Sequence, residues 1–480
     1  MTANRINYLP LDARQKIYLY LKTTPTPNNH PTQISYQKEK IVKNIDLPFD
    51  IVKISPSVVQ IIEQDTGLSL YYDNESLAIS FDAPPPTEHH SLPLTDLPLG
   101  NPFPDSAIRK RLSRLTINVT KSCNLRCEYC YAEYGKYGSA AKEHELDDFL
   151  NVLESLTSHY HTIDRVQFFG GEPLLAKTKI IATILFFEKS AQLGVLKNLP
   201  KFSVVTNGTL LHKKDILEML SQHNFQVTVS IDGPKEITNI LRPTASRRSL
   251  DTYEQIQRGI SAAIDVGLEV ATEGTFTRKH QDLGITPLDV IDHINFAYGL
   301  GAVHIAPAAF SEWGDQRPNE HQAAAEFYNA AYTSGHRIVT NSGPVLDMSI
   351  SVVSQLAQRK RSQEYCPAFT SQLSIDASGY VFPCFMSMSA SETNLGHLAN
   401  DIWPTEKSLS LHSAYSEQMK NGALGTRHAI WFDSLITGCA AADYLANKIY
   451  GKDSDCLIHE AIIAGTLLGV TQGSRGTLPH

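Results

Sequence analysis

Short apolar segments alternate with longer helical patterns through the middle of this 480-residue chain. Segments rich in Val, Ile, Phe and Thr favour strands. Six of them lie at 115–119, 165–169, 202–206, 227–231, 269–276 and 302–307. Repeated strand–helix–strand units predict a parallel sheet with right-handed crossovers. Six units are too few for a closed eight-fold barrel, so we expect an open, partial (β/α)6 barrel of the α/β class.

The segment before this region predicts a small α+β module. A strand is expected from Phe49 to Ile54, and SPSVVQIIEQDTG reads as an N-capped helix that ends at Gly67. The following SLSLYYDNESLAISF predicts a hairpin that turns at Asp73 and Asn74. We also expect a short helix or loose structure near 14–22.

Proline clusters and changes of pattern divide the chain into four parts. Residues 83–106 contain APPP and PLTDLPLGNPFP without periodicity, which is typical of a linker. We therefore expect an N-terminal module with its linker at 1–106 and a core at 107–310. A bridging helical region is expected at 311–365 and a C-terminal domain at 366–480.

Composition excludes several classes of function. A net charge of −8 without a long basic run argues against nucleic-acid binding. No apolar run is long enough to span a bilayer, and the N-terminus lacks a signal-peptide apolar region, so we expect a cytoplasmic protein. Seven cysteines in such a chain favour metal binding or catalysis over a disulfide scaffold.

Three of these cysteines, Cys123, Cys127 and Cys130, lie in LTINVTKSCNLRCEYCYAEYG, directly after the strand at 115–119. Sites in parallel α/β folds lie at the carboxyl ends of strands. Thiolates suit iron–sulfur clusters or zinc. A structural zinc site needs a fourth ligand, and none follows within about ten residues, the nearest candidate being His144. A four-iron cluster with one open iron is therefore favoured, and a zinc knob or unpaired buried thiols remain the alternatives.

The cysteine spacing and three further motifs resemble the radical S-adenosylmethionine (SAM) superfamily. FFGGEPLL at 168–175, TNG at 206–208 and SIDGP at 230–234 each end a predicted strand. The resemblance implies a [4Fe–4S] cluster that binds SAM, with Tyr129 near the adenine, Glu172 receiving the ammonium group, and Ser230 and Arg242 contacting the carboxylate. It also places Gly170, Gly171 and Asn207 in the cofactor site, the two glycines permitting close backbone approach. Relatives often carry His-Asp before the arginine, where this chain has Thr238-Asn239.

Four cysteines remain, and the first two resemble the opening of the SPASM domain, an auxiliary-cluster module of peptide-modifying radical SAM enzymes. They lie in CPAFTSQLSIDASGYVFPC, whose Gly379 predicts a turn between two strands. The later SPASM cysteines are mostly missing, so we infer one auxiliary [4Fe–4S] cluster rather than two. Its expected ligands are Cys366, Cys384, Cys439 and Cys456. Either of the last two could instead be a buried thiol, which would leave an open iron.

The resemblance implies reductive cleavage of SAM to a 5′-deoxyadenosyl radical. The motifs look closest to maturases of ribosomally made peptides, which install thioether or carbon–carbon crosslinks. The implied partners are a precursor peptide and a reducing protein such as flavodoxin or ferredoxin. The module at 46–82 either pairs with a leader peptide at a sheet edge or packs on the barrel as an extension.

Three functional hypotheses stay open. The first is the peptide maturase. The second is another radical SAM outcome, such as a peptide epimerase or an enzyme of a small metabolite. The third is a non-enzymatic iron–sulfur or zinc protein. Sulfatase maturation is disfavoured, because relatives with that activity carry a catalytic Asp after the second SPASM cysteine, where this chain has Phe385. The sequence does not identify a catalytic base.

Overall fold

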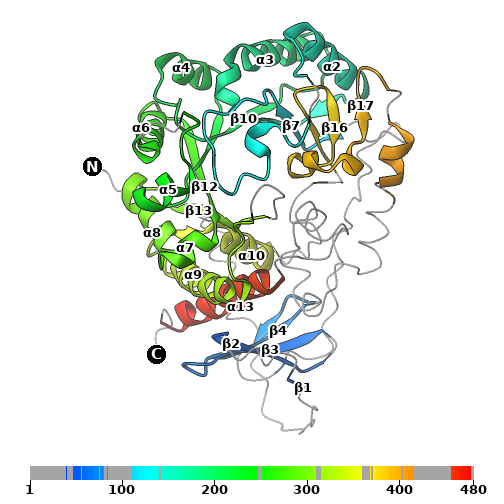
Figure 1. The fold of residues 1–480 in the computed structure, drawn as a ribbon. Helices are drawn as coiled ribbons and strands as arrows, with labels where there is room; N and C mark the ends of the chain where they lie inside the picture. The colour runs from blue at the N-terminus through cyan, green and yellow to red at the C-terminus, as the bar shows by residue number, and fades with distance from the viewer. Residues whose placement is uncertain are drawn as a thin grey trace.

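A curved, mainly parallel sheet forms the centre of the computed structural model, with helices on its outer side (Figure 1). The described residues are 39–40, 47–55, 57–74, 76–80, 84, 111–139, 142–246, 251–309, 315–358, 368, 371–401, 404–411, 413 and 456–476. The segments at 14–22 and 85–106, together with Cys366 and Cys439, lie outside them. Among the described residues, no helix has both the length and the apolar character needed to cross a membrane.

All six strands predicted for the barrel are confirmed. They are β7 (Arg114–Asn118), β9 (Arg165–Phe169), β10 (Lys201–Thr206), β11 (Gln226–Ser230), β12 (Glu269–Phe276) and β13 (Ala302–Pro307). Each pairs in parallel with its neighbour in chain order. The helices between them are α2 (Leu146–His159), α3 (Lys177–Gln192), α4 (Lys214–Gln222), α5 (Lys235–Leu241), α6 (Thr252–Asp265), α7 (Arg278–Asp282) and α8 (Pro287–Tyr298). The open, partial barrel of the α/β class is therefore confirmed.

Additional strands extend the sheet beyond both ends of the six-stranded unit. At one end, β14 (Val345–Leu346) pairs in parallel with β13 and lies between α9 (Glu320–Thr340) and α10 (Asp347–Gln358). At the other end, β15 (Gln372–Ile375) pairs in parallel with β7. The antiparallel β16 (Tyr380–Phe382) and β17 (Gly396–His397) follow β15. The predicted turn at Gly379 is confirmed, because Gly379 has a φ of 84° between β15 and β16.

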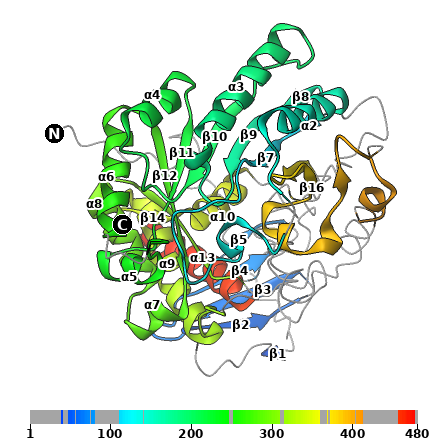
Figure 2. The same cartoon turned by 45° about the horizontal axis from the view of Figure 1, so that its top comes forward.

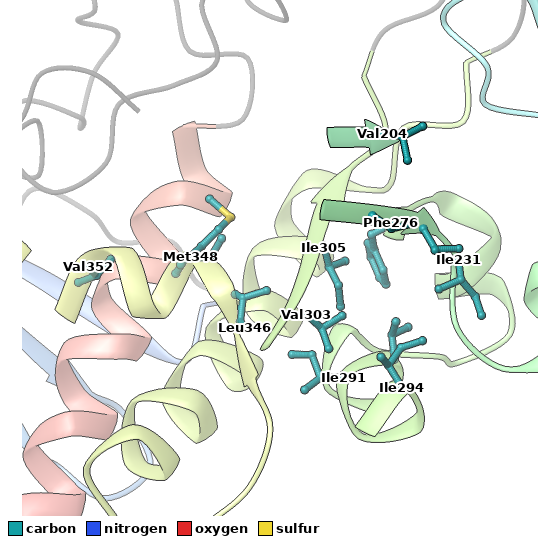
Figure 3. Packing of buried hydrophobic residues seen from close by; sticks show 14 of the residues in the cluster. Val204, Ile231, Phe276, Ile291, Ile294, Val303, Ile305, Leu346, Met348 and Val352 are labelled. Atoms are coloured by element: carbon teal, nitrogen blue, oxygen red, sulfur yellow. The ribbon is translucent and has the colours of Figure 1, made fainter. Parts of the chain in front are cut away.

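Side chains alternate between the two faces of the sheet, and the outward ones form the core with the helices. Val303 and Ile305 of β13 are buried and lie beside Ile291 and Ile294 of α8 (Figure 3). On β11 and β13 the residues between the buried ones are half-buried and point to the inner face. The inner face therefore carries the side chains that remain available for chemistry.

The N-terminal module is a β-sheet in its described part, so the predicted helix is wrong. Its strands run in the order β1 (Glu39–Lys40), β2 (Phe49–Lys53), β3 (Val58–Glu63), β4 (Ser69–Asp73) and β5 (Ile79–Ser80), all antiparallel. The segment read as a helix contains β3, where the β-branched residues of VVQIIE suit a pleated sheet better than a helix. The predicted strand at 49–54 and the hairpin after it are confirmed.

The helix α13 (Cys456–Gly476) lies between α9 and the N-terminal sheet (Figures 1 and 2). It is buried along almost its whole described length. The sheet also contacts α9 directly, since the rings of Phe49 and Tyr328 stack with centroids 5.0 Å apart. Residues 456–476 belong to the segment 366–480 that is predicted as a C-terminal domain, and this helix packs on α9 and α10 and contacts β3 and β4 of the N-terminal sheet.

Glycines let α13 and α9 approach at backbone distance. A Cβ atom added at Gly469 would lie 2.0 Å from the carbonyl oxygen of Tyr332, and one at Gly465 would lie 2.5 Å from that of Tyr328. On α9, a Cβ at Gly335 would lie 2.4 Å from the carbonyl oxygen of Thr466. The close spacing between these two helices therefore depends on glycine, which has no side chain, at these three positions.

Replacing Gly469 with Ala should destabilise the protein, although Gly→Ala within a helix ordinarily adds about 0.5–1 kcal/mol of stability. The added methyl group forces the backbones apart, and overpacking of this kind typically costs about 1–3 kcal/mol. Urea unfolding of the variant measures this loss. Gln472→Ala is the matched control, because Gln472 is exposed on the same helix. Equal stability of Gly469→Ala and the parent protein would contradict the proposed contact.

Candidate functional site

The three motif cysteines lie on the loop that follows β7, at the carboxyl end of the parallel sheet. Ser230, the last residue of β11, lies at the same end because β7 and β11 belong to one parallel set. Backbone N–H groups point at two of the thiols: Leu125 N lies 3.4 Å from the Sγ atom of Cys123, and Tyr134 N lies 3.2 Å from that of Cys130. The loop is therefore already folded around its sulfur atoms.

The electrostatics of this loop suit a metal cluster. Burial raises the pKa of the Cys123 thiol to about 11 and likewise raises the pKa values of Cys127 and Cys130, and like-charge repulsion from neighbouring motif thiols adds to the rise at Cys123 and Cys127. Thiols in such surroundings stay protonated unless a metal supplies positive charge, since a coordinating thiol is deprotonated by the metal. N–H groups directed at sulfur are also among the features that set cluster potentials. The residues present therefore fit an iron–sulfur cluster.

The zinc alternative gains no support from the geometry. His144, its nearest candidate ligand, packs against His397 with ring centroids 5.5 Å apart, and its backbone N–H donates to the carbonyl oxygen of Ala377. Within the described part of the chain, no group of three or more His, Cys, Asp or Glu side chains is arranged to hold a single metal ion. A single zinc ion needs its ligands to meet at one point, whereas three thiols that bind different irons of one cluster do not.

The Gly-Gly turn after β9 supports the cysteine loop by direct backbone contact. Gly171 N donates to the carbonyl oxygen of Thr120 at 2.9 Å, and Glu172 N donates to that of Ser122 at 2.8 Å. A Cβ at Gly171 would lie 2.2 Å from the Ser122 carbonyl oxygen, and one at Gly170 would lie 2.6 Å from that of Thr120. The predicted close backbone approach is therefore present, and what approaches is the cysteine loop itself.

Glu172 is fully buried and anchors this turn. Its carboxylate accepts hydrogen bonds from Leu174 N at 3.0 Å, from the Thr206 hydroxyl at 2.7 Å and from Asn207 N at 2.8 Å. Burial raises its pKa to about 7 in spite of these donors. The assignment of Glu172 to the SAM ammonium group stays a prediction, and the carboxylate already has a structural role.

The TNG motif is joined to the cysteine loop through side chains. The Asn207 amide donates to the side-chain oxygen of Asn124 at 2.8 Å, and Asn124 donates to the hydroxyl of Thr209 at 2.9 Å. Asn207 also accepts from Thr209 N at 3.1 Å. Asn207 therefore braces the loop between Cys123 and Cys127, and its predicted contact with SAM remains untested.

Asp232, in the middle of SIDGP, organises the next part of the site. Its carboxylate forms a bidentate pair with Arg242 at 2.8 and 3.1 Å, accepts from the Tyr129 hydroxyl at 2.8 Å and accepts from Thr275 N at 3.0 Å. Arg242 also lies over the Tyr129 ring, 5.4 Å from its centroid. These contacts bring Tyr129 and Arg242 together beside Cys127. Their predicted roles at adenine and carboxylate stay predictions.

Ser230 belongs to a row of polar side chains on the inner face of the sheet. Its hydroxyl donates to Glu273 of β12 at 3.0 Å, and Glu273 is directly opposite His304 of β13 in the strand register. His304 in turn bonds through Nδ1 to the Asp347 carboxylate at 3.0 Å. Asp347 raises the pKa of His304 to about 9, and Glu273 adds a smaller contribution in the same direction.

Sequence reasoning missed Asp232, Glu273, His304 and Asp347. Asp232 lies inside the SIDGP motif, Glu273 is an ionisable residue inside the predicted strand at 269–276, and His304 is an ionisable residue in an otherwise apolar strand. A charge near the carboxyl end of a parallel strand is the signal that could have found them. Asp347 carries no such signal, because the two-residue strand before it is too short to recognise.

Cys384 is buried directly after β16, near the end of the cysteine loop. Tyr131 and Tyr137 lie within electrostatic reach of both Cys130 and Cys384. An apolar cluster of Ala132, Tyr137, Phe382 and Met388, with Phe169 and Phe385 beside it, fills this region. Cys456 begins α13, and its side chain is not described. The structure thus places one expected auxiliary ligand near the motif cysteines and leaves the other three untested.

The chain matches the Radical SAM superfamily model over residues 117–294. It is 34% identical over 158 residues to a cysteine-type anaerobic sulfatase-maturating enzyme of Clostridium perfringens, covering 31% of this chain and 39% of that protein. It is 33% identical over 145 residues to an uncharacterized protein of Archaeoglobus fulgidus, covering 29% and 31%. The chain spans about a third of the length of these two curated relatives.

Longer but weaker similarities exist. The chain is 23% identical over 300 residues to the radical SAM cyclopropyl synthase TigE of Paramaledivibacter caminithermalis, covering 57% of this chain and 58% of that protein. Its structure resembles that of anSMEcpe with bound AdoMet, with a TM-score of 0.60 and 18% identity, over 76% of this chain and 96% of that chain. At this identity the structural likeness concerns the fold.

Replacing Gly171 with Ala should disturb the cysteine loop. The added Cβ collides with the Ser122 carbonyl group, so the loop must shift, and iron retained after anaerobic reconstitution should fall towards about half of the parent level, which is what the auxiliary cluster alone would hold. Lys214→Ala on α4 is the control, because the exposed Lys214 side chain takes no part in this contact. Full iron retention in Gly171→Ala would contradict the supporting role of this turn.

Replacing Asp347 with Asn should lower the pKa of His304 from about 9 towards its ordinary value of 6.5. The imidazolium loses its nearest carboxylate, and Glu273 alone supports the charge. An NMR titration of the His304 ring measures the change. Because folding raises the pKa of His304, the stability that its charge contributes is complete below pH 6.5 and disappears as the pH rises through 9. The variant should lose this pH dependence of stability. An unchanged His304 pKa would contradict the pairing.

Proposed function

We propose that this protein is a radical SAM enzyme that modifies a peptide or protein. The observation that carries the proposal is the loop of Cys123, Cys127 and Cys130, held by the Gly-Gly turn at the carboxyl end of a partial (β/α)6 barrel. The match of residues 117–294 to the Radical SAM superfamily supports it. So do relatives named as a sulfatase-maturating enzyme and a cyclopropyl synthase.

A [4Fe–4S] cluster on these three thiolates would supply the electron that cleaves SAM to methionine and a hydrogen-abstracting 5′-deoxyadenosyl radical. The protein's own residues bind the cluster and SAM, orient them and shield them from water. The backbone contacts of Gly170 and Gly171 fix the loop, while Asp232 orients Tyr129 and Arg242 beside it. We assign SAM binding to this group of residues, together with Glu172, Asn207 and Ser230.

The finer proposal is a crosslink, thioether or carbon–carbon, in a ribosomally made peptide. The structural neighbour anSMEcpe has been seen with a bound peptide, Cp18Cys, which supports a peptide substrate for this fold. Oxidation of a sulfatase is disfavoured, because the position expected to hold a catalytic Asp is Phe385. Its ring packs on Phe169 with centroids 4.5 Å apart, so no carboxylate is available there.

An auxiliary [4Fe–4S] cluster on Cys366, Cys384, Cys439 and Cys456 belongs to the same proposal. The buried Cys384, separated from the cysteine loop by aromatic side chains, supports a second redox site near the first. Electrons would come from a partner such as flavodoxin or ferredoxin. The module at 46–82 is proposed to bind a leader peptide, because β1 and β5 are the edge strands of its described sheet and an extended peptide pairs with such an edge.

The deciding experiment replaces Cys123, Cys127 and Cys130 together with Ala. The parent protein, reconstituted without oxygen, should hold about eight irons per chain from two four-iron clusters and should form 5′-deoxyadenosine with SAM and dithionite. The variant should keep about four irons and form no 5′-deoxyadenosine, because the three thiolates of the motif are gone. Lys214→Ala, an exposed change on α4, is the control and should match the parent.

Unchanged 5′-deoxyadenosine production by the triple variant would refute the enzyme class. Coexpression with small open reading frames beside the gene, followed by mass spectrometry of each peptide, tests the substrate. Loss of two hydrogens supports a crosslink, while a deuterium gained from D2O without other change indicates epimerisation. Turnover of no peptide together with consumption of a metabolite would favour the small-molecule alternative.

A further inference from the structure

Two polar side chains lie on neighbouring strands of the inner face, Glu273 on β12 and His304 on β13. Glu273 and His304 are register partners on adjacent parallel strands, which lie about 4.8 Å apart and direct paired side chains to one face. The neighbours of His304 on its strand, Val303 and Ile305, point outward to α8 (Figure 3). His304 therefore points inward, on the side of Ser230 and Glu273.

Both side chains are held from one end and open at the other. Ser230 donates to Oε1 of Glu273 at 3.0 Å, and Asp347 binds Nδ1 of His304 at 3.0 Å. In the part of the chain that the structure describes, no hydrogen bond engages Oε2 of Glu273 or Nε2 of His304. Neither atom is among the buried ones that lack a partner, so both reach solvent. Two fixed groups thus present one free acceptor and one free donor.

The charges favour a neutral ligand. Glu273 and Asp347 bring two carboxylates to a single imidazolium, so the row is net negative, and a substrate carboxylate would be repelled. The ligand needs an acceptor for His304 and a donor for Glu273. A peptide group offers this combination, since each carries one N–H donor and one C=O acceptor. Hydrogen bonds to charged partners are also the stronger kind.

We propose that Glu273 and His304 form a clamp for a backbone peptide group of the substrate, with Asp347 and Ser230 as the positioning residues behind it. The clamp rests on the proposed function, because it lies beside the predicted SAM contact Ser230 and would hold the peptide against the site of hydrogen abstraction. It recognises backbone rather than side chains. Specificity for sequence must then come from other surfaces, such as the N-terminal sheet.

Binding of two small probes tests the clamp. The amide probe is N-methylacetamide, which is a single peptide group, and the ester probe is methyl acetate, which keeps the carbonyl group but has no N–H. Equilibrium dialysis with the anaerobically reconstituted, SAM-loaded protein measures both. His304→Ala and His304→Gln remove the charged donor and should weaken both probes about tenfold or more. Glu273→Ala should weaken the amide by a similar factor and leave the ester unchanged.

His293→Ala is the matched control, since His293 of α8 bonds to the Tyr253 hydroxyl away from the inner face. Thermal unfolding of each variant checks its fold. Equal loss of amide and ester in Glu273→Ala, or no loss in the His304 variants, would overturn the clamp. So would a weaker SAM affinity with unchanged probe binding, which would assign the pair to the cofactor. Absence of 5′-deoxyadenosine from the parent protein, with the probe pattern intact, would instead refute the proposed function and leave the clamp standing.

Discussion

The site depends on contact between two backbones that side chains would prevent. The cysteine loop lies directly on the turn after β9, where Gly170 and Gly171 leave room for the carbonyl groups of Thr120 and Ser122. Gly135, farther along the loop, approaches the same turn, since a Cβ there would lie 2.6 Å from the Cα of Gly171. Three thiols on one loop can share a cluster only if the loop keeps its shape. Here neighbouring strands of a rigid sheet impose that shape, rather than the loop's own residues.

A buried ion pair fixes the other half of the site. Asp232 and Arg242 are 1% and 5% exposed, so neither charge is solvated by water. Removing one member of such a pair typically costs about 3–5 kcal/mol, because the other charge is left buried and alone. Asp232 offsets the cost of burial with its further bonds to Tyr129 and to Thr275 N. Asp232, for which the sequence predicted no role, therefore orients Tyr129 and Arg242, which were both predicted to contact SAM.

Features that depend on residues close together in the sequence could be predicted, and features that depend on distant residues could not. The six barrel strands are apolar runs between helices, and every one was predicted at its position within a residue or two. The cysteine spacing, the Gly-Gly turn and the Gly379 hairpin are also local, and they were found. The helix predicted for the segment containing β3 is wrong. Its Ser-Pro start resembles a helix cap, whereas VVQIIE forms a strand because β2 and β4 flank it. Pairing with partners distant in sequence decides such cases.

Non-local contacts also explain the residues that were missed. Asp232 is important because of its bidentate pair with Arg242, 10 residues away, and its hydrogen bond from Thr275 N, 43 residues away. The pKa of His304 is raised mainly by Asp347, which follows β14 at the edge of the barrel sheet. A strand of two residues is invisible to periodicity, yet it changes the charge of a side chain on its neighbour.

The two faces of the sheet divide stability from chemistry. Outward residues such as Val303 and Ile305 are buried against helices, and their removal would leave cavities in the core. Inward residues on the same strand, such as His304, are half-buried, so they contribute less to packing. One barrel can thus keep a common cluster loop while the inner face changes with the substrate. In this chain that face carries the polar side chains of Glu273 and His304 on neighbouring strands and an aromatic contact between Phe169 and Phe385.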